Sequence, residues 1–576
     1  MTFVLHPLHE LGVEQCIPQK IKMNTRRTMP FCTLTIPRLA SLAAAAILAI
    51  LAAGCSTPRR MAALEEDVDS LLTAAQQEAF PSRQPEHFQH QTSSDAKQND
   101  APPAKISLDL RGALQYAAAN NRDYQTARDT LVYSALTLRG TLHDWEWNPT
   151  NNFSAIFGIN QKPSYSTLAT ESGIGFTHRL AAGGRLTGRL ATSTLRYFSG
   201  DHSLSISSIA SLTLAQPLLQ GFGNAIAREP LTQAERNLVY ALRTFVRTRE
   251  SLQISIARKY YAVLNAEDAL EIAKKSHAGF QASLERSEAM ADANRVNQFE
   301  VDQARQRVLT AETNLVSREE DLQTARDELK LALALPLETE LEVERADLQR
   351  LLDVELPTPP MTLDEAVAMA LQQRLDLATT EDEAEDAKRA IDVAEDAMRA
   401  KLDLTLDARA ASETRNRLSA IRGMSADYSA QLDLDLPFDR MAETIALKRA
   451  IMAYQRKLRD VNARRDEITL ELRLTWQQLQ SYAKNILIQK NSVKLAERRV
   501  ENTQLLFEGG RIEIRELLDA QDDLSSASTS LTSALVNHRI CWLTLLYQLG
   551  APDVEPDTLW SPGLEVSNNT QSSPSP

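Results

Sequence analysis

The sequence contains few cysteines, few glycines and few aromatic residues. Of its 576 residues, four are cysteine and 19 are glycine, and aromatic residues make up 5%. The cysteines show neither the even spacing of a disulfide framework nor the paired spacing of a zinc site. Alanine, leucine, glutamate, arginine and glutamine are abundant instead, which favours long helices.

The chain also lacks a net positive charge. Its 63 lysines and arginines face 76 aspartates and glutamates, giving a net charge of −13. Nucleic acid is therefore not expected as a partner, because phosphate binding needs a basic face. The histidines at positions 143, 178, 202, 277 and 538 lie far apart without ligand spacing, and no nucleophile–base pair or set of metal ligands appears. The sequence thus predicts no enzyme, no metal site and no cofactor.

No apolar run is long enough to cross a membrane as a helix. The longest, Leu39–Leu51, covers 13 residues and follows several arginines. This length fits the apolar part of a signal peptide. Residues 1–54 are therefore predicted to be a leader that directs the chain out of the cytoplasm, with Met23 or Met29 as alternative starts.

The leader ends in Ala52-Ala53-Gly54-Cys55, which resembles a bacterial lipoprotein box. Cys55 is accordingly predicted to be the lipidated first residue of the mature chain. Leu51 lies four residues before this cysteine instead of the usual three. Simple cleavage at a small-residue site is therefore the alternative.

A helix–turn–helix pattern occurs twice at a fixed offset. Asn294–Glu300 corresponds to Gly510–Glu516, and each is followed by a helical pattern that closes on Pro336 or Pro552. The offset is 216 in both comparisons (511 − 295 and 552 − 336). Two copies are too few for a solenoid, so they indicate a duplicated half-domain.

The repeat defines a domain plan. The first repeat covers residues 106–335 and the second covers 361–552, with an equatorial linker at 336–360. Residues 55–105 are predicted to be a flexible tether with little core, apart from a short helical patch at 61–80, and 553–576 a disordered tail. Coiled-coil periodicity predicts six helices, two of them reaching on the order of 100 Å. They cover residues 110–143, 230–290, 299–335, 363–400, 441–507 and 514–549.

Between the first two helices of each copy, apolar and polar residues alternate. In the second copy Leu402, Leu404 and Leu406 alternate with acidic or hydroxyl residues, and 428–436 continues the pattern. Such strands are typical of a membrane β-barrel, and a soluble sheet with one wet face is the alternative. A membrane barrel needs at least eight strands, whereas this chain offers four to six. If the strands form a membrane barrel, several copies must therefore share it.

The first copy is longer in this strand region. The repeat starts differ by 253 positions (366 − 113), whereas the prolines after the strands differ by 220 (437 − 217). About 33 extra residues therefore lie among the strands of the first copy. They predict an extra hairpin that turns at Ala181-Ala182-Gly183-Gly184.

Together these features resemble the bacterial outer-membrane efflux protein family, the TolC-like outer membrane factors, and specifically its lipoprotein type. The order and duplication of the motifs carry the resemblance. The motifs are Ser107-Leu108 to Ala113-Leu114, Thr362–Val367, Gln216–Leu219, Leu436–Phe438, Phe507–Arg511 and Glu516–Ala520.

The resemblance implies a mainly α fold with membrane β structure. Duplicated long-helix hairpins would form a trimeric α-barrel joined to a shared outer-membrane β-barrel of twelve strands. The homotrimer would be the exit duct of a tripartite efflux pump or type I secretion system. Its partners would be a periplasmic adaptor, an inner-membrane transporter of the RND, ABC or MFS type, and outer-membrane lipid. A periplasmic coiled-coil lipoprotein scaffold without a pore is the alternative.

The family also implies roles for the helix turns. Glu516 and Asp519 would line the tunnel constriction, although acids at the start of a helix also suit its first turn. Glu300 would form a latch with Arg511 or Arg515, near Phe507, because Ile512 occupies the position of the expected arginine. The turns would dock the adaptor through Asn294, Arg295, Val296, Gly509, Gly510 and Ile512.

Overall fold

A computed structural model describes residues 57–80, 105–161, 164–198, 204–353, 359–412, 425–436 and 438–550. The chain divides into two compact units, Met1–Leu64 and Glu65–Pro576, and the architecture below is that of the second unit. The predicted leader, Cys55 and the tail at 553–576 lie outside the described residues. Within the described part of the chain, no helix is both long enough and apolar enough to span a bilayer.

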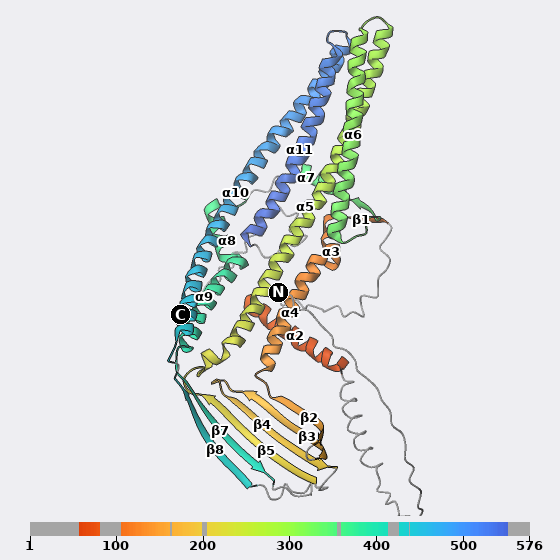
Figure 1. Cartoon of the computed structure of the whole chain (residues 1–576). Helices are drawn as coiled ribbons and strands as arrows, with labels where there is room; N and C mark the ends of the chain where they lie inside the picture. Colours follow the sequence, from red (N-terminus) through yellow and green to blue (C-terminus); the bar gives the residue numbers. More distant parts are fainter. Residues whose placement is uncertain are drawn as a thin grey trace, which may run out of the picture. The chain divides into compact units, whose positions relative to one another are not determined.

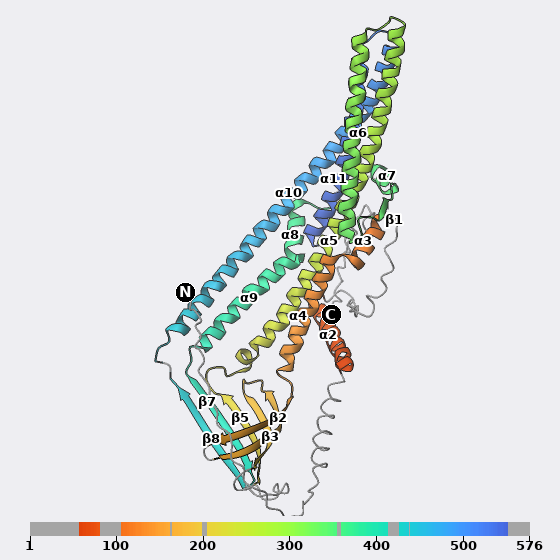
Figure 2. The ribbon, with the colours of Figure 1, turned by 45° about the vertical axis from the view of Figure 1, so that its right-hand side comes forward.

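Two copies of a helical unit make up most of the second unit. Each copy has two shorter helices followed by a long antiparallel pair (Figures 1 and 2). The long pairs contact each other through α11 and α5. The predicted mainly α fold with a β part is confirmed. The helices are α3 (Leu110–Asn120), α4 (Arg122–His143), α5 (Asn224–Asp292), α6 (Gln298–Leu333), α8 (Leu363–Gln373), α9 (Leu375–Asp396), α10 (Met441–Glu508) and α11 (Ile514–Leu549).

The first predicted helix of each copy is broken. Asn121 separates α3 from α4, and Arg374 separates α8 from α9, at the offset of 253 found between the repeat starts. Both residues have extended backbones that cap the following helix. The Asn121 side chain accepts a hydrogen bond from the amide of Tyr124 at 2.9 Å. The prediction of one continuous helix is therefore wrong in both copies.

The long helices pack through the predicted apolar seams. On α10, Ile468, Leu472 and Ile486 are fully buried. The spacing between these residues is close to a whole number of helical turns, so they lie on one face of α10. Tyr260 and Tyr261 of α5 are also fully buried, where the two copies meet.

A small parallel sheet joins the start of the first copy to residues 336–360, which were predicted to be a linker. Strand β1 (Lys105–Leu108) pairs with β6 (Glu340–Val343), and the short helix α7 (Ala346–Asp353) follows. The buried Asp347 carboxylate accepts a hydrogen bond from the Tyr260 hydroxyl at 2.7 Å. This bond attaches the segment to the long helix α5.

The predicted strands form one antiparallel sheet, seen in both views (Figures 1 and 2). Its order is β2-β3-β4-β5-β7-β8, so β2 and β8 are the edges. The predicted extra hairpin is confirmed: β3 and β4 pair around a turn in which the Leu180 amide donates to the Gly184 carbonyl at 2.7 Å. The strands are β2 (Asn148–Gln161), β3 (Ser164–Arg179), β4 (Arg185–Tyr197), β5 (Leu204–Pro217), β7 (Lys401–Ala411) and β8 (Ser425–Asp435).

Part of the predicted tether is a packed helix. Residues 65–79 belong to α2 (Thr57–Ala79), and Val68 and Leu72 are buried. The Asp67 carboxylate accepts from Arg139 Nε of α4 at 2.8 Å. The predicted helical patch at 61–80 is confirmed, whereas the prediction of a flexible tether with little core is wrong for this stretch.

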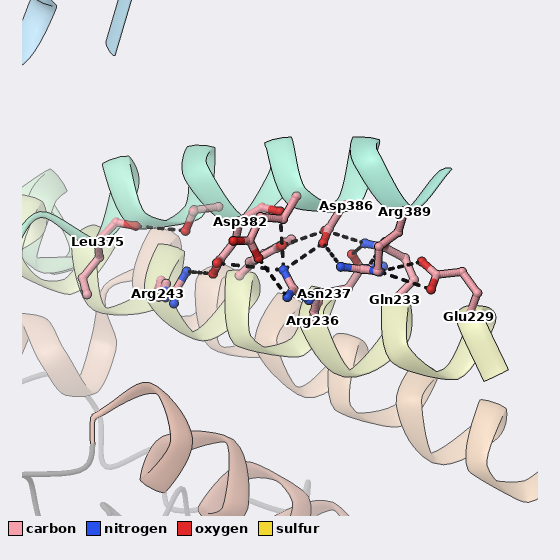
Figure 3. A network of polar contacts seen from close by, with 12 residues as sticks. Glu229, Gln233, Arg236, Asn237, Arg243, Leu375, Asp382, Asp386 and Arg389 are labelled. Carbon is pink, nitrogen blue, oxygen red and sulfur yellow. Dashed lines mark hydrogen bonds and ion pairs between the residues drawn. The ribbon is translucent and has the colours of Figure 1, made fainter. Parts of the chain in front are cut away.

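A polar network joins α5 of the first copy to α9 of the second (Figure 3). Asp386 accepts from Arg236 at 2.9 Å and from the Tyr240 hydroxyl at 2.6 Å, and Asp382 accepts from Arg243 at 2.6 Å. Several half-buried charges thus satisfy one another, which fixes the register between the two copies.

Candidate functional site

The turns between the long helices share one backbone conformation. Asn294 (φ 54°) and Gly510 (φ 65°), 216 positions apart, both adopt the left-handed conformation after a helix end. In each turn the following amide donates to the carbonyl five residues earlier, at 2.9 Å in the first turn and 3.0 Å in the second. Asparagine and glycine are the residues that tolerate this cap. The sequence repeat therefore encodes two equivalent helix tips.

The predicted docking residues gather on these tips. Asn294, Arg295, Gly509 and Gly510 are exposed, whereas Val296 and Ile512 are partly buried. Asn297 caps α6 by accepting from the Glu300 amide at 3.0 Å. Adaptor docking stays a prediction, because the structure contains one chain alone.

A small apolar core supports the tips. Phe507 is 1% exposed and packs with Phe280 of α5, Ala304 of α6 and Leu517 of α11. The side chain predicted to lie near the latch therefore holds the ends of the two hairpins together. This packing keeps the acidic start of α11 in a fixed position.

The two predicted constriction acids have different surroundings. Glu516 is exposed, whereas Asp519 is half-buried and bound to Arg307 of α6. Arg307 Nη2 lies 2.8 Å from Asp519, and its Nη1 lies 2.8 Å from Asp522. One guanidinium thus connects the first hairpin with two acids of the second.

Arg307 and Asp522 were absent from the predicted site. One sequence signal points to Arg307: this position of the first copy corresponds to Asp523 of the second (307 + 216), so the repeat reverses its charge there. Burial raises the pKa of the Asp522 carboxyl above its usual range. Arg307 opposes this shift, and the neighbouring Asp519 and Asp523 add to it.

The predicted latch pair does not form within the single chain. Among the described residues, no ion pair joins Glu300 to Arg511 or Arg515, and Arg515 instead lies 3.8 Å from Asp519. A different pair, Arg286 to Glu508 at 3.2 Å, connects α5 with α10 near the tips. The latch between Glu300 and an arginine stays a prediction.

The sheet has one apolar face along all six described strands. The register places Leu212 opposite Ala408 and Leu404 opposite Leu432, so residues of like polarity share a face. Many of these side chains are exposed in the single chain. They include Phe153, Phe157, Ile159, Ile174, Leu190, Leu212, Leu406, Tyr428, Leu432 and Leu434.

The opposite face is polar and charged. Arg189 pairs with Glu171, and the Thr213 hydroxyl donates to Asp407 at 2.5 Å. Asp403 and Asp433, directly opposite each other in the register, continue this face onto the edge strand. The sheet is therefore two-sided, with its charged pairs on one face and most of its large apolar side chains on the other.

Exposed apolar side chains also mark the two outermost long helices. The helix pairs contact each other in the order α10, α11, α5, α6, which leaves one side of α10 and one side of α6 without a neighbouring long helix. Large apolar residues are exposed on both. They include Leu470, Leu474, Leu487, Ile488, Leu495 and Leu505 on α10, and Phe299, Leu309, Val316 and Leu331 on α6.

The side chains that could bind a metal are scattered over the part of the chain that the structure describes. Over the described ranges, no group of three or more His, Cys, Asp or Glu side chains is placed to hold a metal ion. Cys541 is buried as a free thiol on α11, and burial raises its pKa to about 11.

The family model of the outer membrane efflux protein matches residues 164–335, from β3 to the end of the first copy. This match confirms the family resemblance. No match appears among the curated proteins. The family consists of outer membrane channels, and the duct of a tripartite pump or secretion system is its general role.

Solved structures of outer membrane channels share the fold. CusC is 16% identical, with a TM-score of 0.58 over 77% of this chain and 92% of its own. VceC from Vibrio cholerae is 15% identical, with a TM-score of 0.56 over 77% and 96%. The open state of MtrE from Neisseria gonorrhoeae is 14% identical, with a TM-score of 0.56 over 77% and 88%. At such low identity the likeness concerns the fold alone.

Proposed function

We propose that identical copies of this chain form the outer-membrane exit duct of a tripartite efflux pump or type I secretion system. The two-faced sheet carries the proposal. Its apolar face has no covering layer within the described part of the chain, and exposed phenylalanine and leucine side chains suit contact with lipid. Its polar face suits a water-filled interior.

The edges of the sheet require further copies. In lipid every backbone amide and carbonyl needs a partner, so a membrane sheet must close on itself. Six described strands are fewer than the eight of the smallest such barrels. Strands alternate in direction from β2 to β8, so β8 of one copy meets β2 of the next as an antiparallel neighbour.

The helices support the same head-to-tail contact. The exposed apolar sides of α6 and α10 lie at opposite ends of the helix order, as β2 and β8 do in the sheet order. One interface therefore covers both pairs of surfaces, and such heterologous contacts generate rings. The family resemblance gives three copies. Three times six strands is eighteen, in place of the expected twelve.

The remaining predictions complete the proposal. Cys55 would carry lipid and anchor the chain at the outer membrane. The two tips would dock the periplasmic adaptor, which would open the passive channel for an inner-membrane transporter. Glu516 and Asp519 would narrow the tunnel at the start of α11.

Conductance in a planar lipid bilayer tests the duct. We expect stepwise conductance from the purified protein, and altered conductance and cation block when Glu516→Ala is combined with Asp519→Ala. The control combines Glu497→Ala with Glu501→Ala, two exposed acids on α10. If conductance and cation block are unchanged in the variant that lacks Glu516 and Asp519, these acids serve only to stabilise the first turn of α11. A water-soluble extended particle without conductance would favour the scaffold.

A further inference from the structure

A pocket of about 550 Å³ lies beside one end of the sheet. It is formed by α2, the end of α4, the end of β3 and the start of α5. Leucines from three of these helices supply apolar walls. The charged and aromatic lining residues include Asp67, Arg139, Trp145, Glu146, His178 and Arg228.

The pocket contains both paired and unpaired charge. Arg139 is held by Asp67 at 2.8 Å and by Glu146 at 3.1 Å, and each carboxylate keeps about half of its side-chain surface exposed. Arg228 is exposed and forms no hydrogen bond or ion pair with any residue that the structure describes. His178 Nδ1 is buried without a hydrogen-bond partner among the same residues. Glu146 also lies 3.0 Å from His143 Nδ1. Arg228 and His178 are thus available to an outside ligand as donors, and the exposed halves of the two carboxylates as acceptors.

The pocket adjoins the apolar face of the sheet. Trp147 is 58% exposed and stacks on His178 with ring centroids 4.6 Å apart. It also lies 5.1 Å from the ring of Phe176, on the same face. Tryptophan is enriched where hydrocarbon meets lipid headgroups, because its ring is apolar and its N–H is polar. A charged pocket next to this ring lies at headgroup depth if the apolar face contacts lipid.

We propose that this pocket binds the phosphoethanolamine headgroup of a phospholipid. The inference rests on the proposed membrane insertion of the sheet. Arg228 would contact the phosphate, with His178 as a second donor, and the carboxylates of Asp67 and Glu146 would receive the ammonium. The acyl chains would continue along the apolar face past Phe176.

The ligand class follows from the charges. Arginine is suited to phosphate, and carboxylates accept hydrogen bonds from a primary ammonium. A choline headgroup has no N–H to donate, and a purely anionic headgroup leaves the two carboxylates facing negative charge. A zwitterion with a primary amine satisfies both halves of the pocket.

Lipid retention tests the assignment. The purified oligomer is placed in nanodiscs with equal parts of phosphatidylethanolamine, phosphatidylglycerol and phosphatidylcholine, released, and analysed by native mass spectrometry. We expect retention of phosphatidylethanolamine over the other two. Arg228→Gln should reduce that retention about tenfold, the value of one charge-assisted hydrogen bond. Arg185→Gln is the matched control, because Arg185 starts β4 across from Arg179, with its side chain outside the pocket.

Three results would overturn the proposal. They are equal retention in Arg228→Gln and the control, no preference for phosphatidylethanolamine, or Arg228-dependent binding of inorganic phosphate without retained lipid. Conductance of the same preparations distinguishes failure of the headgroup site from failure of the proposed duct function. Channels with unselective lipid binding would refute the headgroup site alone, whereas absence of channels from the wild-type protein would refute the duct and the site together.

Discussion

Arg307 is the residue through which the two hairpins meet most directly at the acidic start of α11. It bonds to Asp519 and Asp522 at 2.8 Å each. These acids lie three positions apart on one helix face, so one planar guanidinium reaches both. An arginine here neutralises charge that would otherwise be concentrated near the proposed constriction.

Removing this guanidinium should change the tip more than removing its neighbour. Arg307→Ala removes the two ion pairs that join α6 to Asp519 and Asp522 of α11, so the two helices should separate more easily at the tip. We expect higher conductance and stronger cation block in a planar bilayer. Arg305→Ala is the control, because Arg305 pairs with Glu288 inside the first hairpin. Equal effects in both variants would show that Arg307 has no special role.

A second residue-scale contrast concerns the ends of α6 and α11. Ala334 (φ 57°) and Gly550 (φ 71°), 216 positions apart, both adopt the left-handed conformation. This conformation is strained for alanine and free for glycine. A Cβ at position 550 would also lie 3.1 Å from the carbonyl carbon of Gln373.

Reciprocal substitutions should therefore have opposite effects. Ala334→Gly should stabilise the fold by up to about 1 kcal/mol, and Gly550→Ala should destabilise it by about 1–2 kcal/mol or more. The midpoint of thermal unfolding, followed by circular dichroism, measures both. If both variants shift the midpoint of thermal unfolding in the same direction, the backbone strain assigned to Ala334 is contradicted.

At the scale of elements, the break between α8 and α9 is held by charge. The Arg374 side chain is 2% exposed and bonds to Asp376 and Glu471 at 2.7 Å each. Burial alone would raise the pKa of Asp376, but hydrogen bonds from Arg374 and Arg464 outweigh it and keep this pKa well below its usual range. Asp376 therefore stabilises the fold while it is ionised.

Asp376→Asn should lower the thermal midpoint at pH 7, because it leaves Arg374 buried with one partner fewer. The cost is about 3 kcal/mol, the scale for breaking a buried pair. A depressed pKa gives stability that is complete above the unfolded value near 3.8 and is lost as pH falls through the folded value. The difference from wild type should therefore narrow below about pH 4. The control Asp466→Asn, an exposed acid on α10, should change little at any pH.

The sheet offers a contrast between adjacent residues of β8. Leu432 lies on the apolar face and Gln431 on the polar face. Leu432→Arg should cost about 2–4 kcal/mol per copy if that face contacts lipid, and Gln431→Arg should cost little. The yield of heat-modifiable oligomer in the outer-membrane fraction measures the difference. Equal yields would argue that neither face contacts lipid.

Much of this element plan was readable from the sequence. Apolar residues such as Ile468, Leu472 and Leu479 recur at helical spacing within one segment, so periodicity alone predicted the long helices. The fixed offset between the two copies predicted the tips at positions 294 and 510. The 33 extra residues in the strand region of the first copy likewise predicted the β3–β4 hairpin.

The missed features depend on contacts between distant segments. The break at Arg374 depends on Glu471, 97 residues away, and the pair of Arg307 with Asp519 spans 212 residues. Local periodicity carries no information about such pairs. Helix α2 was predicted as a helical patch without a core because the surrounding composition is polar, and its burial depends on tertiary packing.

At the scale of the whole molecule, the account depends on ring closure. The described sheet ends at β2 and β8, and the long helices end at α6 and α10, with apolar side chains exposed on each of these helices. A single copy therefore leaves matching surfaces uncovered at both ends. Head-to-tail contact between copies covers them all with one repeated interface.

Electron cryo-microscopy of the purified particle in detergent tests this claim most directly. We predict a closed ring of three copies in which β8 of each copy pairs antiparallel with β2 of the next, giving eighteen strands from three sets of six. The same map should place α10 of one copy beside α6 of its neighbour. A monomer, or a two-fold dimer in which like edges face each other, would contradict the account.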